Sequence, residues 1–231
     1  MNQNVKEPFF AVYDKAFLDV LGSSPTITLV VEKDWPFAHE AGVYIPKQDA
    51  VYINSNYFSP GQETERTIKT SKVSRQADGS WQSDVIQSGI LMGNGGVNYR
   101  GGVLFCAQGD QSSPAGLVLM DLESPYTTRT LIDSYHGRSF NSPNDIVVAR
   151  DGSVWFTDPI YGHEKGFRGK PQLPCQVYRF EPESGDIRVV ADGFGRPNGL
   201  CFSPDEKTMY VTDTDWIHGD GTTDPQRSST M

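Results

Sequence analysis

Four polar residues recur at matching positions ahead of short apolar runs, and each carries a side-chain oxygen. They are Glu40, Asn94, Asn144 and Asn198, which lie 54, 50 and 54 residues apart. Carboxylate and amide oxygens suit a hard cation such as Ca²⁺, which takes about 6–8 oxygen ligands. Zinc prefers histidine or cysteine, and the spacing of the histidines in this chain matches no zinc pattern. If the fold brings the four positions together, the sequence predicts a divalent-cation site.

The alternative for each of these residues is a local role, because asparagine often caps a strand or forms a turn. Four equivalent positions favour a shared site over four independent caps. His39 adjoins Glu40 and is within reach of the same site, although a packing or surface role is the alternative. Other aspartates follow second strands, and we expect capping or turn roles for them. They are Asp110, Asp158, Asp213 and Asp215.

The elements that must position these oxygens repeat with them. Each lead residue opens an apolar strand, a tight turn and a second strand: "EAGVYIPKQDAVYINS", "NGGVNYRGGVLFCAQ", "NDIVVARDGSVWFTD" and "NGLCFSPDEKTMYVTD". Further strands are predicted behind them, over 67–75, 81–87, 116–122, 128–133, 176–180 and 187–191. Four strands in a repeat of roughly 50 residues are typical of a propeller blade. The predicted fold class is therefore an all-β propeller of four-stranded blades, in which the first strands line a central channel and the lead residues meet at one mouth.

Composition limits the classes of partner. The 231-residue chain is 37% hydrophobic and carries a formal charge of −9, which argues against nucleic-acid and anionic-membrane partners. No secretory signal or membrane span is evident, so a cytoplasmic location is expected. The three cysteines, Cys106, Cys175 and Cys201, are expected to be reduced core residues, with one disulfide and a spare thiol as the alternative. A short helix is predicted over 14–21.

The motifs "HEAGVY", "SPNDIVVARDGSVWFTDPIYG" and "RPNGLCFSPDEKTMYVTD" resemble the gluconolactonase/regucalcin (senescence marker protein) family, and most closely its lactonohydrolase branch. The resemblance implies a six-bladed propeller that holds one divalent cation, usually Ca²⁺, and hydrolyses sugar lactones. It implies that Glu40 and Asn198 bind the metal and that Asn144 binds metal or substrate. Asn94 occupies the equivalent repeat position and is a candidate substrate-binding residue. Tyr161 is expected to border the entrance as a further candidate substrate-binding residue, with a packing aromatic as the alternative.

The chain departs from the family pattern in two places. Regucalcin-like members carry an arginine two residues before the N-D asparagine, where this sequence has Ser142. The resemblance implies a further metal ligand from the next blade, an aspartate that also serves as the general base, and the repeat puts this residue beyond Met231. The catalytic residue is therefore unknown, and the chain is expected to be a C-terminally truncated member with weak or no activity.

The expected organisation is a single incomplete propeller of about three and a half blades over residues 1–231. Residues 1–35 would hold a lead-in and a ring-closing strand near 27–32, and 214–231 would form a polar tail. Open blade edges would favour self-association.

The predicted function is metal-dependent hydrolysis of a sugar lactone, a carboxylic ester, with the cation acting as a Lewis acid and a carboxylate as general base. One alternative is another hydrolase on the same scaffold, a Ca²⁺-dependent phosphotriesterase or a strictosidine-synthase-like enzyme. The other is a non-catalytic protein-binding propeller. Such a scaffold would have no reason to carry Glu40, Asn144 and Asn198 on one ring.

Overall fold

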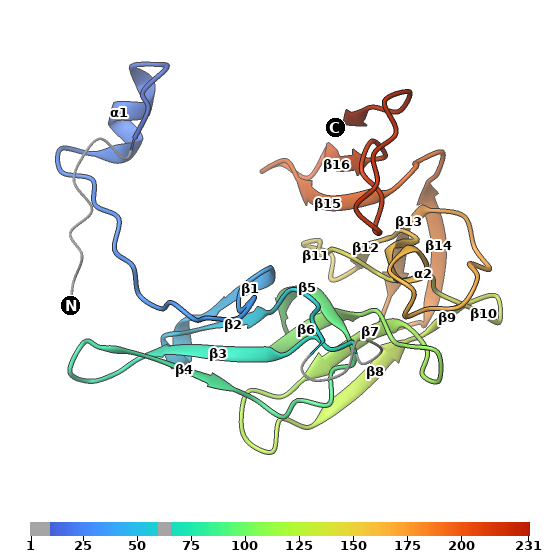
Figure 1. The fold of residues 1–231 in the computed structure, drawn as a ribbon, viewed down its shortest axis with the longest axis horizontal. Coiled ribbons are helices and arrows are strands. Elements are labelled where there is room, and N and C mark those ends of the chain that lie inside the picture. The colour runs from blue at the N-terminus through green and yellow to red at the C-terminus, as the bar shows by residue number, and fades with distance from the viewer. Residues whose placement is uncertain (1–9, 60–65) are drawn as a thin grey trace.

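The computed structural model describes residues 10–59 and 66–231. Its strands form antiparallel sheets that follow one another around an arc, as the blades of a β-propeller (Figure 1). Helices are minimal in the described residues: α1 (Ala16–Leu21), the 3₁₀ turn η1 (Pro46–Gln48) and α2 (Tyr161–Glu164). The predicted all-β propeller is confirmed. None of the helices in this part of the chain is long and apolar enough to span a membrane.

Three blades have four strands each, paired in chain order. The first contains β1 (Glu40–Ile45), β2 (Ala50–Asn54), β3 (Thr70–Arg75) and β4 (Trp81–Val85). The second contains β5 (Gly93–Tyr99), β6 (Gly102–Ala107), β7 (Gly116–Met120) and β8 (Thr128–Ile132), followed by a small hairpin of β9 (Ser134–Tyr135) and β10 (Arg138–Ser139). The third contains β11 (Ile146–Val148), β12 (Val154–Asp158), β13 (Gln176–Glu181) and β14 (Asp186–Ala191). The fourth sheet has three strands, β15 (Pro197–Phe202), β16 (Met209–Thr214) and β17 (Ser229–Thr230).

The tight turns between first and second strands form where the sequence predicts them. Arg100 and Gly101 join β5 to β6 with φ of 45° and 81°. Two consecutive residues with positive φ match the twist of a two-residue hairpin, and glycine adopts that conformation without steric cost. The lead residue of each repeat is thereby placed at the start of a strand pair.

Apolar side chains fill the space between consecutive blades. Phe140, Phe156 and Tyr178 pack between the second and third blades, with ring centroids 5.2–5.3 Å apart. A second cluster, which includes Tyr52 and Phe105, packs the first blade against the second. Each such side chain contributes about 1.5–3 kcal/mol when it is fully buried. These layers hold neighbouring inner strands side by side, in the order β1, β5, β11 and β15.

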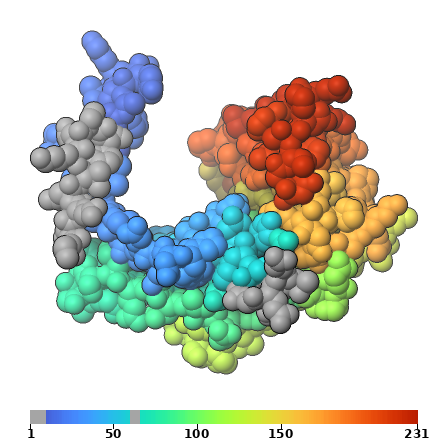
Figure 2. All heavy atoms as spheres, viewed as in Figure 1, coloured from blue at the N-terminus to red at the C-terminus, as the bar shows by residue number. Residues whose placement is uncertain are grey.

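The arc is open in the described residues, and Figure 2 shows a hollow between the N-terminal segment and the fourth sheet. Residues 27–32, predicted as strand, form no regular strand here. A strand needs a neighbour to satisfy its backbone groups, and none of the described strands pairs with this segment. The single-domain boundaries therefore stay a prediction.

The C-terminal residues 214–231, predicted as a polar tail, include one short strand. Residues 214–231 fold back, so that β17 pairs with β16 through Asp213 opposite Thr230.

The expectation that all three cysteines are core residues is partly wrong. Cys106 is a buried core residue, but Cys175 is half-buried and Cys201 is exposed. Cys201 is exposed because none of the described blades packs over the face of β15 on which it lies.

Candidate functional site

The four lead residues take equivalent places at the starts of the inner strands. Glu40 begins β1, Asn94 and Asn198 are each the second residue of β5 and β15, and Asn144 lies two residues before β11. Because the inner strands are neighbours around the arc, these residues lie at the same end of consecutive blades. The structure thus places all four predicted positions along one rim.

The main-chain carbonyls of the asparagines are already used to join blades. Asn54 Nδ2 donates to the Asn94 carbonyl at 2.6 Å, and the Gly95 amide donates to the Asn144 carbonyl at 2.8 Å. Thr157 Oγ1 donates to the Asn198 carbonyl at 2.6 Å. These bonds fix the rim backbone and leave the side chains available for a ligand.

The side-chain oxygens of the three asparagines accept no hydrogen bond from the described part of the chain. Asn94 is the clearest case, because its Oδ1 is buried without a partner. A buried acceptor without a donor calls for a ligand, an ion or water. Amide oxygens beside a carboxylate fit a hard cation such as Ca²⁺. Among residues 10–59 and 66–231 no three His, Cys, Asp or Glu side chains cluster as metal ligands, so amide oxygens would supply most of such a site.

Asn198 is oriented by Tyr161, the first residue of α2. Asn198 Nδ2 donates to the Tyr161 hydroxyl at 3.3 Å, and that hydroxyl also bonds Thr214 Oγ1. The amide nitrogen is therefore occupied, and Oδ1 is the free end of the side chain. Tyr161 is only 7% exposed, and burial raises the pKa of its hydroxyl. Its place at the entrance stays a prediction.

Asp145 is a rim residue that the sequence reasoning did not assign. Its Oδ2 accepts from the Leu200 amide at 2.9 Å and its Oδ1 from the Ile146 amide at 2.8 Å. A Cβ at Gly95 would lie 2.9 Å from Asp145 Oδ1, so glycine is needed there. Burial raises the pKa of Asp145. The signal was present in the repeat, because the residue after the lead position is Ala or Gly in the other three units.

Three ionisable groups lie close to the Glu40 carboxylate. Burial and the nearby Asp145 raise its pKa, and the Lys165 ammonium opposes this rise. His39 Nε2 lies 3.9 Å from Glu40 Oε1, and burial, together with Lys165, lowers the pKa of His39. At neutral pH the imidazole is therefore neutral, and Lys165 is the cation beside this carboxylate. Lys165 lies in the β12–β13 loop, where strand periodicity carries no signal.

The lead-in loops of the third and fourth blades are each clamped by an aspartate. Asp158 accepts from the amides of Asn141 and Ser142 at 2.9 and 2.8 Å. Asp213 accepts from the amides of Gly195 and Arg196 at 2.9 and 2.7 Å. Burial raises the pKa of Asp158 to about 7, although the two amides favour the carboxylate. The expected capping role holds for both aspartates.

The expected turn roles hold for Asp110 and fail for Asp215. Asp110 Oδ1 accepts from the amides of Ser112 and Ser113 at 2.8 Å, as an Asx turn does. Asp215 forms ion pairs instead, with Arg196 at 2.6 Å and with Arg227 at 3.2 Å. The difference arises because Arg196 is nearly buried and needs carboxylate partners.

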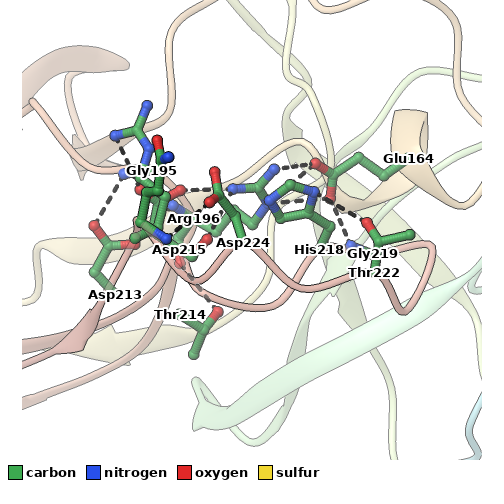
Figure 3. A network of polar contacts seen from close by, with 12 residues as sticks. Glu164, Gly195, Arg196, Asp213, Thr214, Asp215, His218, Gly219, Thr222 and Asp224 are labelled. Atoms are coloured by element: carbon green, nitrogen blue, oxygen red, sulfur yellow. Dashed lines mark hydrogen bonds and ion pairs between the residues drawn. The ribbon is translucent and has the colours of Figure 1, made fainter.

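Arg196 is the centre of the network in Figure 3. Its guanidinium lies between Glu164 of α2 and Asp215, with Nε 3.0 Å from Glu164 Oε1 and Nη1 2.6 Å from Asp215 Oδ1. Glu164 Oε2 also accepts from the Gly219 amide at 2.6 Å. The network therefore ties α2, and with it Tyr161, to the fourth sheet.

Ser142, which stands where regucalcin-like members carry arginine, is used locally. Its hydroxyl donates to the Pro159 carbonyl at 2.7 Å and accepts from the Gly162 amide at 2.9 Å. It therefore holds the loop before α2 and reaches no ligand position.

Known proteins share this fold and these motifs. The family model described as "SMP-30/Gluconolactonase/LRE-like region" matches residues 42–216. Lactonohydrolase oryL of Aspergillus oryzae is 32% identical over 203 residues, covering 84% of this chain and 44% of the relative. Gluconolactonase of Zymomonas mobilis is 38% identical over 94 residues, covering 37% of this chain and 24% of the relative.

A solved X-ray structure of a gluconolactonase candidate from structural genomics superposes with a TM-score of 0.62 at 30% identity, covering 79% of this chain and 58% of that structure. The chain thus spans about half the length of the relatives that it matches over most of its residues. The matched region contains the lead positions of the second, third and fourth blades. The chain belongs to the SMP-30/gluconolactonase/LRE-like family.

Proposed function

We propose that this protein is a lactone hydrolase that acts on a sugar lactone at a divalent-cation site on the propeller rim. Glu40, Asn144 and Asn198 would hold the cation, and Asn94 would offer a further oxygen to cation or substrate. One observation carries the proposal: at equivalent positions of consecutive blades, asparagine side-chain oxygens accept no hydrogen bond from residues 10–59 and 66–231. The names of the lactonohydrolase and gluconolactonase relatives support the substrate class.

A bound cation and the residues of the chain would make different contributions to the reaction. A bound cation supplies Lewis-acid polarisation of the lactone carbonyl. Glu40 provides the negative charge of the ligand set, and amide oxygens complete it without further charge, as Ca²⁺ accepts. Tyr161 would orient Asn198 by accepting from its Nδ2, which leaves Oδ1 to serve as the ligand atom. In the reaction the water oxygen bonds to the carbonyl carbon and the ring C–O bond breaks. Of the two protons of the water, the ring oxygen takes up one as it becomes a hydroxyl group and the other is released to solvent, so that a carboxylate is produced.

Asp145 does not serve as a free general base in this arrangement, since both its oxygens accept backbone hydrogen bonds. Its role is to hold β15 against β11 so that the rim residues stay in register. We assign the general base to none of the described residues.

The test combines binding and turnover. We expect calorimetry to detect one Ca²⁺ site. We expect a pH-indicator assay to detect at most weak hydrolysis of glucono-δ-lactone above the spontaneous rate, because the predicted general base is not among the described residues, and EDTA should abolish this excess. Asn198→Ala and Glu40→Gln should each weaken Ca²⁺ binding by about tenfold or more, the loss of roughly 1.4 kcal/mol or more of binding free energy. Asn98→Ala is the matched control, because Asn98 is an exposed asparagine on β5 whose side chain, among the described residues, bonds only the Tyr44 carbonyl.

Two results would contradict the proposal. Lactone hydrolysis that persists undiminished in EDTA would exclude the metal-dependent form. Cation binding with turnover of a phosphotriester and no turnover of lactones would favour the alternative hydrolase. Self-association and a cytoplasmic location also stay predictions, and light scattering on the purified chain tests the first.

A further inference from the structure

Lys165 reaches from the third blade to the first. It follows α2 directly, and its Nζ lies 5.6 Å from the ring centroid of Tyr161. The same Nζ lies 5.0 Å from the ring centroid of Tyr57, in the loop after β2. Two aromatic faces from different blades thus hold one ammonium group, an arrangement that stabilises a cation.

The Lys165 ammonium donates no hydrogen bond to the part of the chain that the structure describes. It forms no ion pair with any carboxylate of residues 10–59 and 66–231, although Glu40 lies near enough for each charge to act on the other. Arg66 adds a second cation on Tyr57, with its guanidinium carbon 5.0 Å from the ring centroid. In a chain with a formal charge of −9, two cations gathered at one aromatic side chain form a local positive site.

The backbone that carries Lys165 is fixed on both sides. Its amide donates to the Tyr161 carbonyl at 2.8 Å, and the preceding Glu164 is held by Arg196 and by the Gly219 amide. The Phe167 amide donates to the Gly162 carbonyl at 3.1 Å. The ammonium is therefore presented at a set position, next to the tyrosine that orients Asn198.

We propose that Lys165 is the anion-binding residue of this site and binds the carboxylate formed when the lactone ring opens. The inference rests on the proposed function, because hydrolysis converts a neutral ester into a carboxylate at the rim. Lys165 would donate to a carboxyl oxygen, as preorganised cations do where negative charge develops. The same charge repels a divalent cation held at Glu40, so Lys165 favours the anion and disfavours the metal.

Because Lys165 would attract the anion and repel the cation, one substitution should change the gluconate and Ca²⁺ affinities in opposite directions. Lys165→Met should weaken gluconate binding by about tenfold, the loss of one charge-assisted hydrogen bond. It should tighten Ca²⁺ binding by about fivefold, since a like charge several ångströms away is removed. Lys165→Arg should retain both affinities to within about threefold, because it keeps the charge. Lys170→Met, an exposed lysine in the same loop, should change neither.

Calorimetry with gluconate and with Ca²⁺ separates the outcomes, and circular dichroism confirms that each variant is folded. A loss of both affinities in Lys165→Met would show that the side chain only supports the structure, and would overturn the inference. Unchanged gluconate binding would overturn it while leaving the lactonase proposal intact. If no variant bound Ca²⁺ or hydrolysed lactone, the proposed function would fail. A tenfold loss of gluconate binding in Lys165→Met alone would then still support the anion site.

Discussion

The lead-in loops of the third and fourth blades share a backbone plan and differ in one side chain. In each, an aspartate at the end of the second strand accepts two consecutive amides, through Asp158 in one blade and Asp213 in the other. Two residues before the rim asparagine, the third blade has Ser142 and the fourth has Arg196. Ser142 bonds within its own loop, whereas Arg196 reaches Glu164 of the preceding blade. The repeat therefore fixes the backbone conformation of the lead-in loop. The residue two positions before the rim asparagine decides whether that loop bonds within itself or to the preceding blade.

Burial separates the two aspartates as well. Asp158 is fully buried, whereas Asp213 is half-buried. Two amides left without an acceptor lower the free energy of unfolding more where water cannot replace the carboxylate. The aspartate should therefore contribute more to the free energy of unfolding in the third blade than in the fourth, and the following variants test that difference.

Arg196→Met should have the largest effect on stability. It leaves Glu164 and Asp215 without their main cation in a nearly buried setting, where loss of one partner costs about 3–5 kcal/mol. We take the lower part of this range, about 3 kcal/mol, because Arg227 still pairs with Asp215. Urea unfolding of the purified protein measures the change. A loss below about 1 kcal/mol, the size of an exposed ion pair, would contradict a cross-blade tie.

Asp158→Ala should come next. It removes the acceptor of two buried amides, and we expect the free energy of unfolding to fall by about 2–3 kcal/mol. Asp213→Ala, its counterpart in the fourth blade, should cost about 1 kcal/mol because water can reach the freed amides. Equal losses in the two variants, measured by urea unfolding under the same conditions, would remove burial as the cause of the difference.

The pH dependence of stability should distinguish the aspartates independently. The pKa of Asp158 is raised to about 7 in the folded protein, well above the usual aspartate value of about 3.9, so between these values the folded state binds the extra proton. The stability contribution is full at low pH and is lost as pH rises toward 7, at about 1 kcal/mol per pH unit.

Asp158→Asn should remove this part of the slope, and Asp213→Asn should leave it in place. The raised pKa values of Glu40 and Asp145 act in the same direction, so a shallower slope, rather than a flat one, is expected for Asp158→Asn. Urea midpoints taken from pH 5 to pH 8 measure it. Identical slopes in the wild type and Asp158→Asn would show that Asp158 does not titrate in this range.

How far the sequence predicts the structure depends on the range of the interaction. Hairpins and blades were predictable because strand alternation and turn residues are local, as with Arg100 and Gly101. The strand β17 was missed because two polar residues carry no periodic signal, and their pairing depends on the chain folding back. The rim asparagines followed from repeat spacing, and Asp145 was available from the same alignment. Lys165 was beyond reach, because its contact with Tyr57 joins two loops of different blades.

Ser142→Ala should have the smallest effect and completes the comparison with Arg196. It removes one donor and one acceptor of a buried hydroxyl, so we expect a loss of about 1 kcal/mol in the free energy of unfolding. Because Ser142 binds only its own loop, Ca²⁺ and gluconate affinities should stay within about twofold of the wild type. Arg196→Met should reduce gluconate affinity as well, since it releases the segment that presents Lys165. A larger ligand effect in Ser142→Ala than in Arg196→Met would show that the local loop, rather than the cross-blade tie, positions the site.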